Sequence, residues 1–204
     1  MYRYTTPRFI QWFDPFLIWK MKKREQPTLY LTFDDGPHPT ITPWVLEILK
    51  QFNARATFFC VGDNVRKYPE VYAQILREGH STGNHTFNHL NGWKSEKGNY
   101  YANIDSCREL VDSKLFRPPY GKIRPAQVLH LKKQKYQVIM WSILSRDFEA
   151  DLDKEKSLAT LKTSCRDGSI LLFHDSEKAQ KNLEFLLPAL LDHCTSRGFQ
   201  FAAI

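Results

Sequence analysis

The chain has 204 residues, which suits a single domain that is large enough to bury a proper core. Hydrophobic residues make up 42% of it and charged residues 25%, which argues against a wholly disordered chain. The net charge of +7 favours anionic surroundings, but most basic residues are spread along the chain as on a solvated surface, so we expect no nucleic-acid partner. The widely separated cysteines lack a Cys-x-x-Cys pair, so we expect reduced thiols at Cys60, Cys107, Cys165 and Cys194.

The N-terminal stretch of residues 9–19 is apolar and aromatic, and the basic run from Lys20 to Arg24 follows it. The apolar part is too short to span a bilayer, and no small-residue cleavage site follows, so no cleavable signal peptide is expected. We predict that residues 1–27 form an extension that packs its aromatic side chains on the barrel predicted for the later residues. Contact of residues 9–24 with a membrane surface is the alternative. The expected location is therefore cytoplasmic or peripherally membrane-associated.

From residue 28 onward, short apolar runs alternate with helical patterns. The apolar runs predict strands at residues 29–33, 56–61, 81–85, 115–117, 137–143, 169–173 and 199–204. Capping residues, apolar spacing and glycine stops predict helices at residues 42–53, 69–78, 100–112, 125–135, 155–166 and 182–196.

This alternation is typical of right-handed βαβ units with parallel strands, so the expected fold class is α/β. About seven such units on a closed sheet resemble a (β/α) barrel, whose chemistry lies at the carboxyl ends of the strands. An open doubly wound sheet is the alternative, but polar residues follow nearly every strand instead of one switch point. We therefore predict one catalytic domain over residues 28–204, built as a barrel.

Two adjacent carboxylates, Asp34 and Asp35, end the first predicted strand just before a Gly-Pro breaker. Like charges at such a place repel each other unless separate partners divide their roles. A metal ion that binds one carboxylate and an arginine that pairs with the other would meet this need. The remaining sequence contains candidates for both partners.

His85 and His89 are four residues apart, which would place both imidazoles on one face if the segment is helical. Joined to a carboxylate at a strand end, they form the two-histidine, one-carboxylate set that suits zinc or another divalent first-row metal. In the plainer interpretation, one histidine is exposed and the other caps a turn.

Two further strand ends carry polar side chains. Arg117 begins the run Arg-Pro-Pro-Tyr-Gly, in which stiff backbone could fix its guanidinium against a carboxylate while turn amides face the reaction centre. His174 ends the most apolar strand on the same predicted face of the barrel. A surface arginine in a proline turn and a satisfied core histidine are the plainer interpretations of these two residues.

Together these segments resemble the polysaccharide deacetylase family, also called the NodB-homology or carbohydrate esterase 4 group. Its five motifs map in order onto residues 32–37, 85–89, 117–121, 141–148 and 172–174, so the resemblance covers about residues 28–204. The resemblance implies a deformed (β/α) barrel. It also implies metal-dependent hydrolysis of acetyl groups on a sugar or polysaccharide, such as a glycan that contains N-acetylglucosamine.

The resemblance also implies a role for each matching residue. The metal ligands would be Asp35, His85 and His89. The ion would polarise the acetyl carbonyl and activate water, with zinc as the first expectation and Co²⁺, Mn²⁺ or Ni²⁺ as alternatives. Asp34 would be the general base, kept ionised by Arg117.

The remaining implied roles concern the leaving group and the substrate. His174 would be the general acid, with a pKa raised by the carboxylate of Asp147. Because an amine leaves poorly without a proton, this acid favours N-deacetylation over O-deacetylation. Leu172 would line the pocket for the acetyl methyl group.

The fourth motif departs from the family pattern Asp-x-x-Asp-Trp, since Leu144 replaces the first aspartate and Phe148 replaces the tryptophan. Phe148 can still form an aromatic wall with less stacking area for a sugar ring. Tyr120 and Trp93 are further candidates for the substrate groove, although Trp93 could equally serve packing.

Two other functions fit the same sequence less well. A metal-dependent amidase or imidase would use the same machinery on a non-sugar substrate. A non-catalytic glycan-binding module would fit the positive charge, but it would need no general base or general acid.

Overall fold

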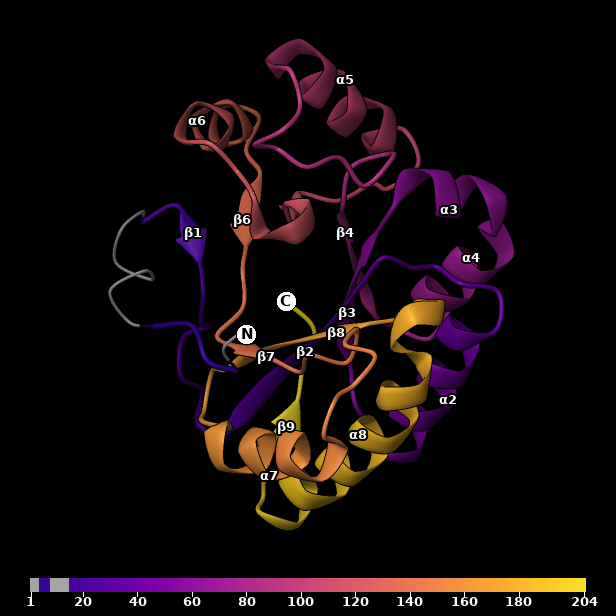
Figure 1. Ribbon diagram of the computed structural model, residues 1–204, viewed down its shortest axis with the longest axis vertical. Coiled ribbons are helices and arrows are strands. Elements are labelled where there is room, and N and C mark those ends of the chain that lie inside the picture. Colours follow the sequence, from indigo (N-terminus) through magenta and orange to yellow (C-terminus); the bar gives the residue numbers. More distant parts are fainter. Residues whose placement is uncertain (1–3, 8–14) are drawn as a thin grey trace.

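The computed structural model describes residues 4–7 and 15–204, in which parallel strands form a curved sheet with helices around it (Figure 1). The strands are β1 (Leu17–Ile18), β2 (Thr28–Asp34), β3 (Ala56–Cys60), β4 (Ser81–Asn84), β5 (Leu115–Phe116), β6 (Gln137–Ile139), β7 (Ile143–Leu144), β8 (Ile170–His174) and β9 (Gln200–Phe201). They follow the order β1-β6-β5-β4-β3-β2-β8-β7, and β9 pairs with β2. The pairings between these strands are all parallel.

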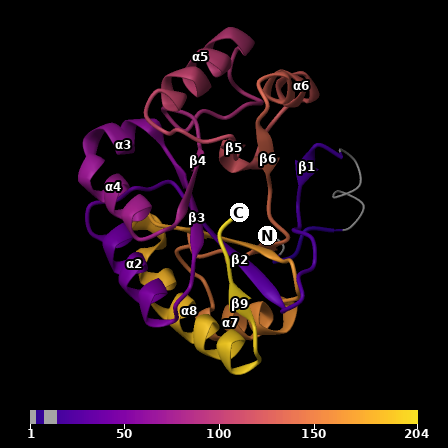
Figure 2. The same cartoon turned by 180° about the vertical axis from the view of Figure 1, so that it is seen from behind.

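The helices lie on the outer side of the sheet, as the two opposite views show (Figure 2). They are α2 (Ile41–Gln51), α3 (Gly62–Lys67), α4 (Pro69–Arg77), α5 (Lys97–Arg108), α6 (Pro125–Lys133), α7 (Lys154–Ser164) and α8 (Glu177–Ser196). Among the described residues, no helix is both long enough and apolar enough to cross a membrane.

Strand β2 belongs to the core, and every residue from Thr28 to Asp34 is buried. The ring of Phe33 stacks on Phe58 at 5.0 Å and on Phe173 at 5.9 Å between ring centroids. These three aromatic side chains join β2 to β3 and β8, and burial of each is worth about 1.5–3 kcal/mol. The central strands therefore form a rigid base for the residues that follow them.

Strand register brings the carboxyl ends together. Asp34 at the end of β2 lies opposite His174 at the end of β8, and opposite Phe59 of β3 on its other side. Asn84, which ends β4 directly before His85, pairs with Cys60 of β3. Because parallel strands end at one edge of the sheet, the polar residues that follow them gather there.

The N-terminal segment hydrogen bonds to both edges of the sheet. On one side β1 pairs with β6 (Figure 2), and on the other Thr5 forms an antiparallel bridge with Ile143 of β7. The carbonyl oxygen of Tyr4 accepts a hydrogen bond from the Leu144 amide at 2.7 Å. The described parts of residues 1–27 are thus joined to the barrel, while the boundary of the extension stays a prediction.

Part of the expected N-terminal aromatic packing falls on residues 9–14, which lie outside the described residues. The alternative membrane contact of residues 9–24, and the expected cytoplasmic or membrane-associated location, also stay predictions.

The single strand predicted over residues 137–143 is wrong. Its two halves are β6, which pairs with β5 and β1, and β7, which pairs with β8. Between β6 and β7 the chain leaves its neighbours β1 and β5 and joins β8 at the other end of the sheet, so the run of apolar residues does not mean continuous pairing. Other elements differ as well: α8 begins at Glu177 instead of residue 182, α5 spans Lys97–Arg108 instead of residues 100–112, and neither α3 nor β1 was predicted.

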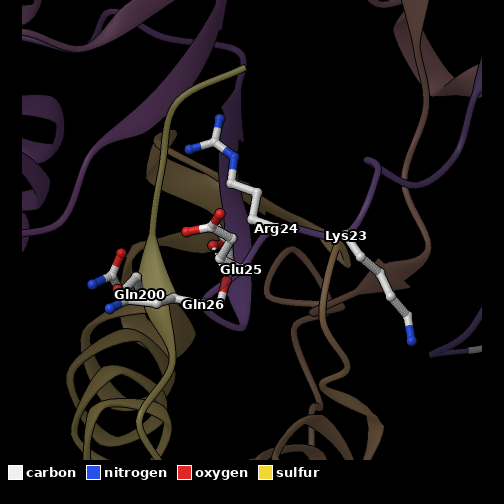
Figure 3. A pocket seen from close by; sticks show the side chains of 6 residues that line it. Lys23, Arg24, Glu25, Gln26 and Gln200 are labelled. Atoms are coloured by element: carbon white, nitrogen blue, oxygen red, sulfur yellow. Dashed lines mark hydrogen bonds between the residues drawn. The ribbon is translucent and has the colours of Figure 1, made fainter.

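A shallow cavity lies at the start of β2, at the opposite end of this strand from Asp34 (Figure 3). It is lined by Lys23, Arg24, Glu25, Gln26, Thr28 and Gln200. None of the predicted site residues lines this cavity, so it is separate from the candidate active site.

Candidate active site

The buried pair of Asp34 and Arg117 lies at the centre of the site. The Arg117 Nη1 group donates to Asp34 Oδ1 at 2.8 Å and to the Thr32 hydroxyl at 2.7 Å. Its other nitrogens donate to the carbonyl oxygens of Ile139 at 3.1 Å and Met140 at 2.9 Å. A fully buried guanidinium with this many partners is held rigidly, and its positive charge compensates the carboxylate.

Three side chains next to this pair could hold one metal ion. Asp35 Oδ1 lies 3.2 Å from His89 Nε2 and 3.8 Å from His85 Nε2. One ligand atom from each of the three residues lies within 4.8 Å of the other two. The predicted metal-binding residues therefore converge, and the atoms that converge are of the kind that binds zinc and similar ions.

The ring of His85 is oriented as a metal ligand requires. Its Nδ1 lies 2.7 Å from the carbonyl oxygen of Arg117, so Nδ1–H donates there and Nε2 keeps its lone pair. Burial lowers the pKa of His85 to about 4, although the charge of Asp34 acts in the opposite direction. The imidazole is thus neutral at physiological pH and free to bind a cation.

The two histidines do not lie on a helix, contrary to the helical arrangement considered from their spacing. The segment after β4 is a turn in which Thr86 (φ 62°) and His89 (φ 55°) adopt left-handed backbone conformations. Asn103 of α5 accepts hydrogen bonds from the amides of Phe87 at 2.8 Å and Asn88 at 2.9 Å. The turn, supported by α5, brings the two imidazoles to 5.0 Å between ring centroids.

Burial alone would raise the pKa of Asp35. The hydrogen bond with His89 and the charges of His174 and His85 outweigh this effect and lower the pKa below its ordinary value. Asp35 is therefore a carboxylate at physiological pH, as a metal ligand must be.

His174 is held by Asp147 on the other side of the site. Burial alone would lower the pKa of His174, but the charge and hydrogen bond of Asp147, and then the charges of Asp35 and Asp34, raise it to about 9. The imidazole is therefore protonated at physiological pH, which is the form that a general acid requires.

Comparisons with known proteins agree with this geometry. The family model described as polysaccharide deacetylase matches residues 21–139, which is more than half of the chain. The chain belongs to the polysaccharide deacetylase family. Over 93% of its length it is 33% identical to a peptidoglycan-N-acetylglucosamine deacetylase of Bacillus cereus, of which it covers 91%. It is also 36% identical to a chitooligosaccharide deacetylase of Azorhizobium caulinodans, over 74% of this chain and 75% of that one.

The fold agrees as well. A crystal structure of a peptidoglycan N-acetylglucosamine deacetylase in complex with 4-naphthalen-1-yl-N-oxidanyl-benzamide has a TM-score of 0.82, with 29% identity. The match covers 92% of this chain and 90% of that one. The family predicted from the sequence motifs and the deformed (β/α) barrel are therefore confirmed.

The predicted substrate-binding residues lie around the site in different ways. Tyr120 is 61% exposed, and its hydroxyl lies 3.2 Å from Nδ1 of His89. The ring of Phe148 meets His174 edge-on at 5.2 Å. Leu172 is buried in β8 two residues before His174, so both side chains share one face of the strand. Their roles in binding substrate stay predictions.

Trp93 lies on the loop that follows His89. Its indole is 54% exposed, yet its Nε1–H donates to the carbonyl oxygen of Ile123 at 2.9 Å. The ammonium group of Lys122 lies 4.1 Å from the ring centroid. These contacts fix the indole in position while they leave much of it open to solvent.

Two residues that touch the turn after β2, Asp175 and Asn64, were not predicted as site residues. Asp175 could have been found from its position directly after the strand-end histidine. Asn64 gives no comparable signal, because its contact depends on the way α3 packs on the end of β2.

Proposed function

We propose that the chain is a metal-dependent hydrolase that removes N-acetyl groups from an acetylated sugar polymer. The proposal rests on one observation: the buried Asp34–Arg117 pair, the Asp35–His85–His89 cluster and the Asp147–His174 pair all meet at one edge of the sheet. The names of the relatives support a substrate that contains N-acetylglucosamine, either peptidoglycan or a chito-oligosaccharide.

We propose Asp35, His85 and His89 as the ligands of a divalent metal ion. The two imidazoles and one carboxylate suit Zn²⁺, with Co²⁺, Mn²⁺ or Ni²⁺ as alternatives. When bound, such an ion would supply a Lewis acid that polarises the acetyl carbonyl and makes water more acidic.

The roles of the chain's own residues follow from their contacts. Asp34 would take the proton of the attacking water, since its Oδ2 lies 3.7 Å from His85 Nε2 at the proposed ligand cluster, while Oδ1 is engaged by Arg117. Through Nε2, His174 would give a proton to the leaving nitrogen of the sugar, because its Nδ1 is already bound to Asp147. The backbone amide near Tyr120 is our candidate donor to the oxyanion.

The protonated state of His174 favours an amide substrate over an ester. An amine is a poor leaving group unless it receives a proton, whereas an alkoxide leaves more readily. A histidine whose pKa is about 9 is mostly protonated at physiological pH, so it can supply this proton.

The exposed aromatic side chains suggest how a polymer would lie on the enzyme. Tyr120 contacts His89, a proposed ligand, and the next two residues after Gly121, Lys122 and Ile123, contact the indole of Trp93. We propose that the reacting sugar lies near Tyr120 and that a neighbouring sugar of the chain stacks on Trp93.

Metal analysis followed by an acetate-release assay tests the proposed function. The purified chain should contain one divalent metal ion and should release acetate from N-acetylated chito-oligosaccharides or from peptidoglycan. Chelation should abolish the release, and added Zn²⁺ should restore it. A metal-loaded chain that binds these glycans without releasing acetate would instead be a glycan-binding module.

A further inference from the structure

The peptide group between Asp35 and Gly36 has an unusual conformation. Asp35 has a φ of 82°, a left-handed backbone conformation that a residue with a Cβ rarely adopts. Such a conformation persists only where surrounding contacts hold it in place. Since Asp35 is a proposed metal ligand, whatever holds this peptide also sets the direction of its carboxylate.

Two side chains hold this one peptide group from its opposite ends. The amide Nδ2 of Asn64 donates to the carbonyl oxygen of Asp35 at 2.8 Å. The Gly36 N–H donates to Oδ1 of Asp175 at 3.0 Å. Both hydrogen-bonding groups of the peptide are therefore occupied, and rotation of the peptide would break both bonds.

Asp175 is itself fixed. Its Oδ2 accepts a hydrogen bond from the Thr42 hydroxyl of α2, and its backbone N–H donates to the carbonyl oxygen of Asp34 at 3.1 Å. A Cβ on Gly36 would clash with the Asp175 carboxylate, so only glycine allows this close approach. Both carboxylate oxygens are engaged in the interior, which makes Asp175 a positioning residue and not a catalytic one.

Asn64 links the same peptide to the histidine turn. It lies in the first turn of α3, whose Gly62 and Asp63 amides donate to the carbonyl oxygens of Thr86 at 3.0 Å and Phe87 at 2.9 Å. Those carbonyls belong to the turn between the two proposed histidine ligands. Helix α3 therefore holds the Asp35 peptide and the histidine turn in one fixed relation.

We infer that Asn64 and Asp175 form a clamp on the Asp35–Gly36 peptide that positions the Asp35 carboxylate for metal binding. The inference rests on the proposed metal site, and it assigns to these residues a role in the affinity for the ion. The peptide group is one rigid plane, so the single hydrogen bond that remains after loss of either contact cannot fix its orientation, and each contact depends on the other.

Metal affinity, measured by competition with a chromogenic chelator, tests the clamp. Asn64→Ala and Asp175→Ala should each raise the dissociation constant for Zn²⁺ about tenfold or more. The double variant should be little worse than either single variant, because the two contacts act on one peptide. Asp175→Asn should remain near wild type, since an amide oxygen can still accept from the Gly36 N–H.

Gln74→Ala is the matched control, because it removes a side-chain amide from the neighbouring helix α4. Among the side-chain hydrogen bonds of the described residues, the Gln74 amide makes one, to Glu78 at 2.8 Å. This control should bind Zn²⁺ as the wild type does. Thermal unfolding of all the metal-free chains shows whether each variant is folded, and Asn64→Ala tests the clamp should Asp175→Ala fail to fold.

Unchanged Zn²⁺ affinity in folded Asn64→Ala would overturn the clamp while it leaves the proposed function intact. A wild-type chain that binds none of Zn²⁺, Co²⁺, Mn²⁺ and Ni²⁺ would overturn both. A loss of affinity in Asn64→Ala and Asp175→Ala, with Asp175→Asn and Gln74→Ala near wild type, would support the clamp.

Discussion

Asp147 holds His174 at two points. One carboxylate oxygen, Oδ1, lies 2.8 Å from Nδ1 of the ring, and the other, Oδ2, accepts from the backbone N–H of His174 at 2.7 Å. Asp147 is fully buried, and the side chain of Asn182 donates to its carbonyl oxygen at 2.8 Å. The ring is therefore fixed with Nε2 as its remaining nitrogen, and its positive charge is stabilised.

Asp147→Asn should move the alkaline limb of the pH–rate profile to lower pH. His174 must be protonated to act as an acid, so wild-type activity should fall as pH rises through its pKa of about 9. Without the Asp147 charge, burial dominates and the pKa falls by about one unit or more. Profiles of kcat against pH for both chains check this, and an unchanged alkaline limb would contradict the assignment of His174.

Arg117→Met should destabilise the fold. It leaves the Asp34 carboxylate buried without its partner, which costs about 3–5 kcal/mol. Arg108→Met is the matched control, because Arg108 pairs with Asp105 on the surface at 3.4 Å and should contribute only about 0.2–1 kcal/mol. Denaturant unfolding measures the free energy of unfolding of both variants. Equal losses of this free energy would show that the buried pair stabilises the fold no more than the surface pair does.

His89→Ala should remove the bound metal ion, since only Asp35 and His85 would remain of the three proposed ligands. His130→Ala is a suitable control, because His130 lies on α6, stacks on Tyr101 of α5 and takes no part in the cluster. Elemental analysis of the purified variants compares their metal content. A His89→Ala chain with wild-type metal content would exclude the proposed site.

Trp93→Ala should weaken binding of long substrates alone. Loss of one stacking contact is worth about 0.5–1.5 kcal/mol, so KM for an N-acetylated tetrasaccharide should rise roughly 2- to 10-fold with kcat nearly unchanged. Leu129→Ala removes another exposed apolar side chain, on α6, and should leave KM as it is. If KM for the tetrasaccharide does not change in Trp93→Ala, Trp93 serves packing and not the substrate.

The chemistry-bearing positions could be predicted because they follow strands whose pattern is local. Asp34 and His174 end apolar runs, and the parallel register then places them side by side. The shape of the histidine turn could not be predicted, because Asn103, 15 residues after Asn88 and on helix α5, holds it. The same reason explains why Asn64 went unnoticed, since its partner is the Asp35 carbonyl on another element.

The split between β6 and β7 was missed for a related reason. Apolar character indicates burial but not the pairing partner, and the chain there changes neighbours from β5 to β8. The N-terminal segment pairs with both halves of this run, with β6 through β1 and with β7 through Thr5. Such long-range pairing leaves little trace in a local pattern.

The most direct test of the account is acetate release by Asp34→Asn on an N-acetylated chito-oligosaccharide, with metal content measured on the same sample. We predict a fall in kcat of about 10²–10⁴-fold, because the amide cannot take the proton of the attacking water. Metal content should stay at the wild-type level, since Asp34 pairs with Arg117 and is not one of the proposed ligands. Near wild-type activity in a folded, metal-loaded Asp34→Asn chain would contradict the account.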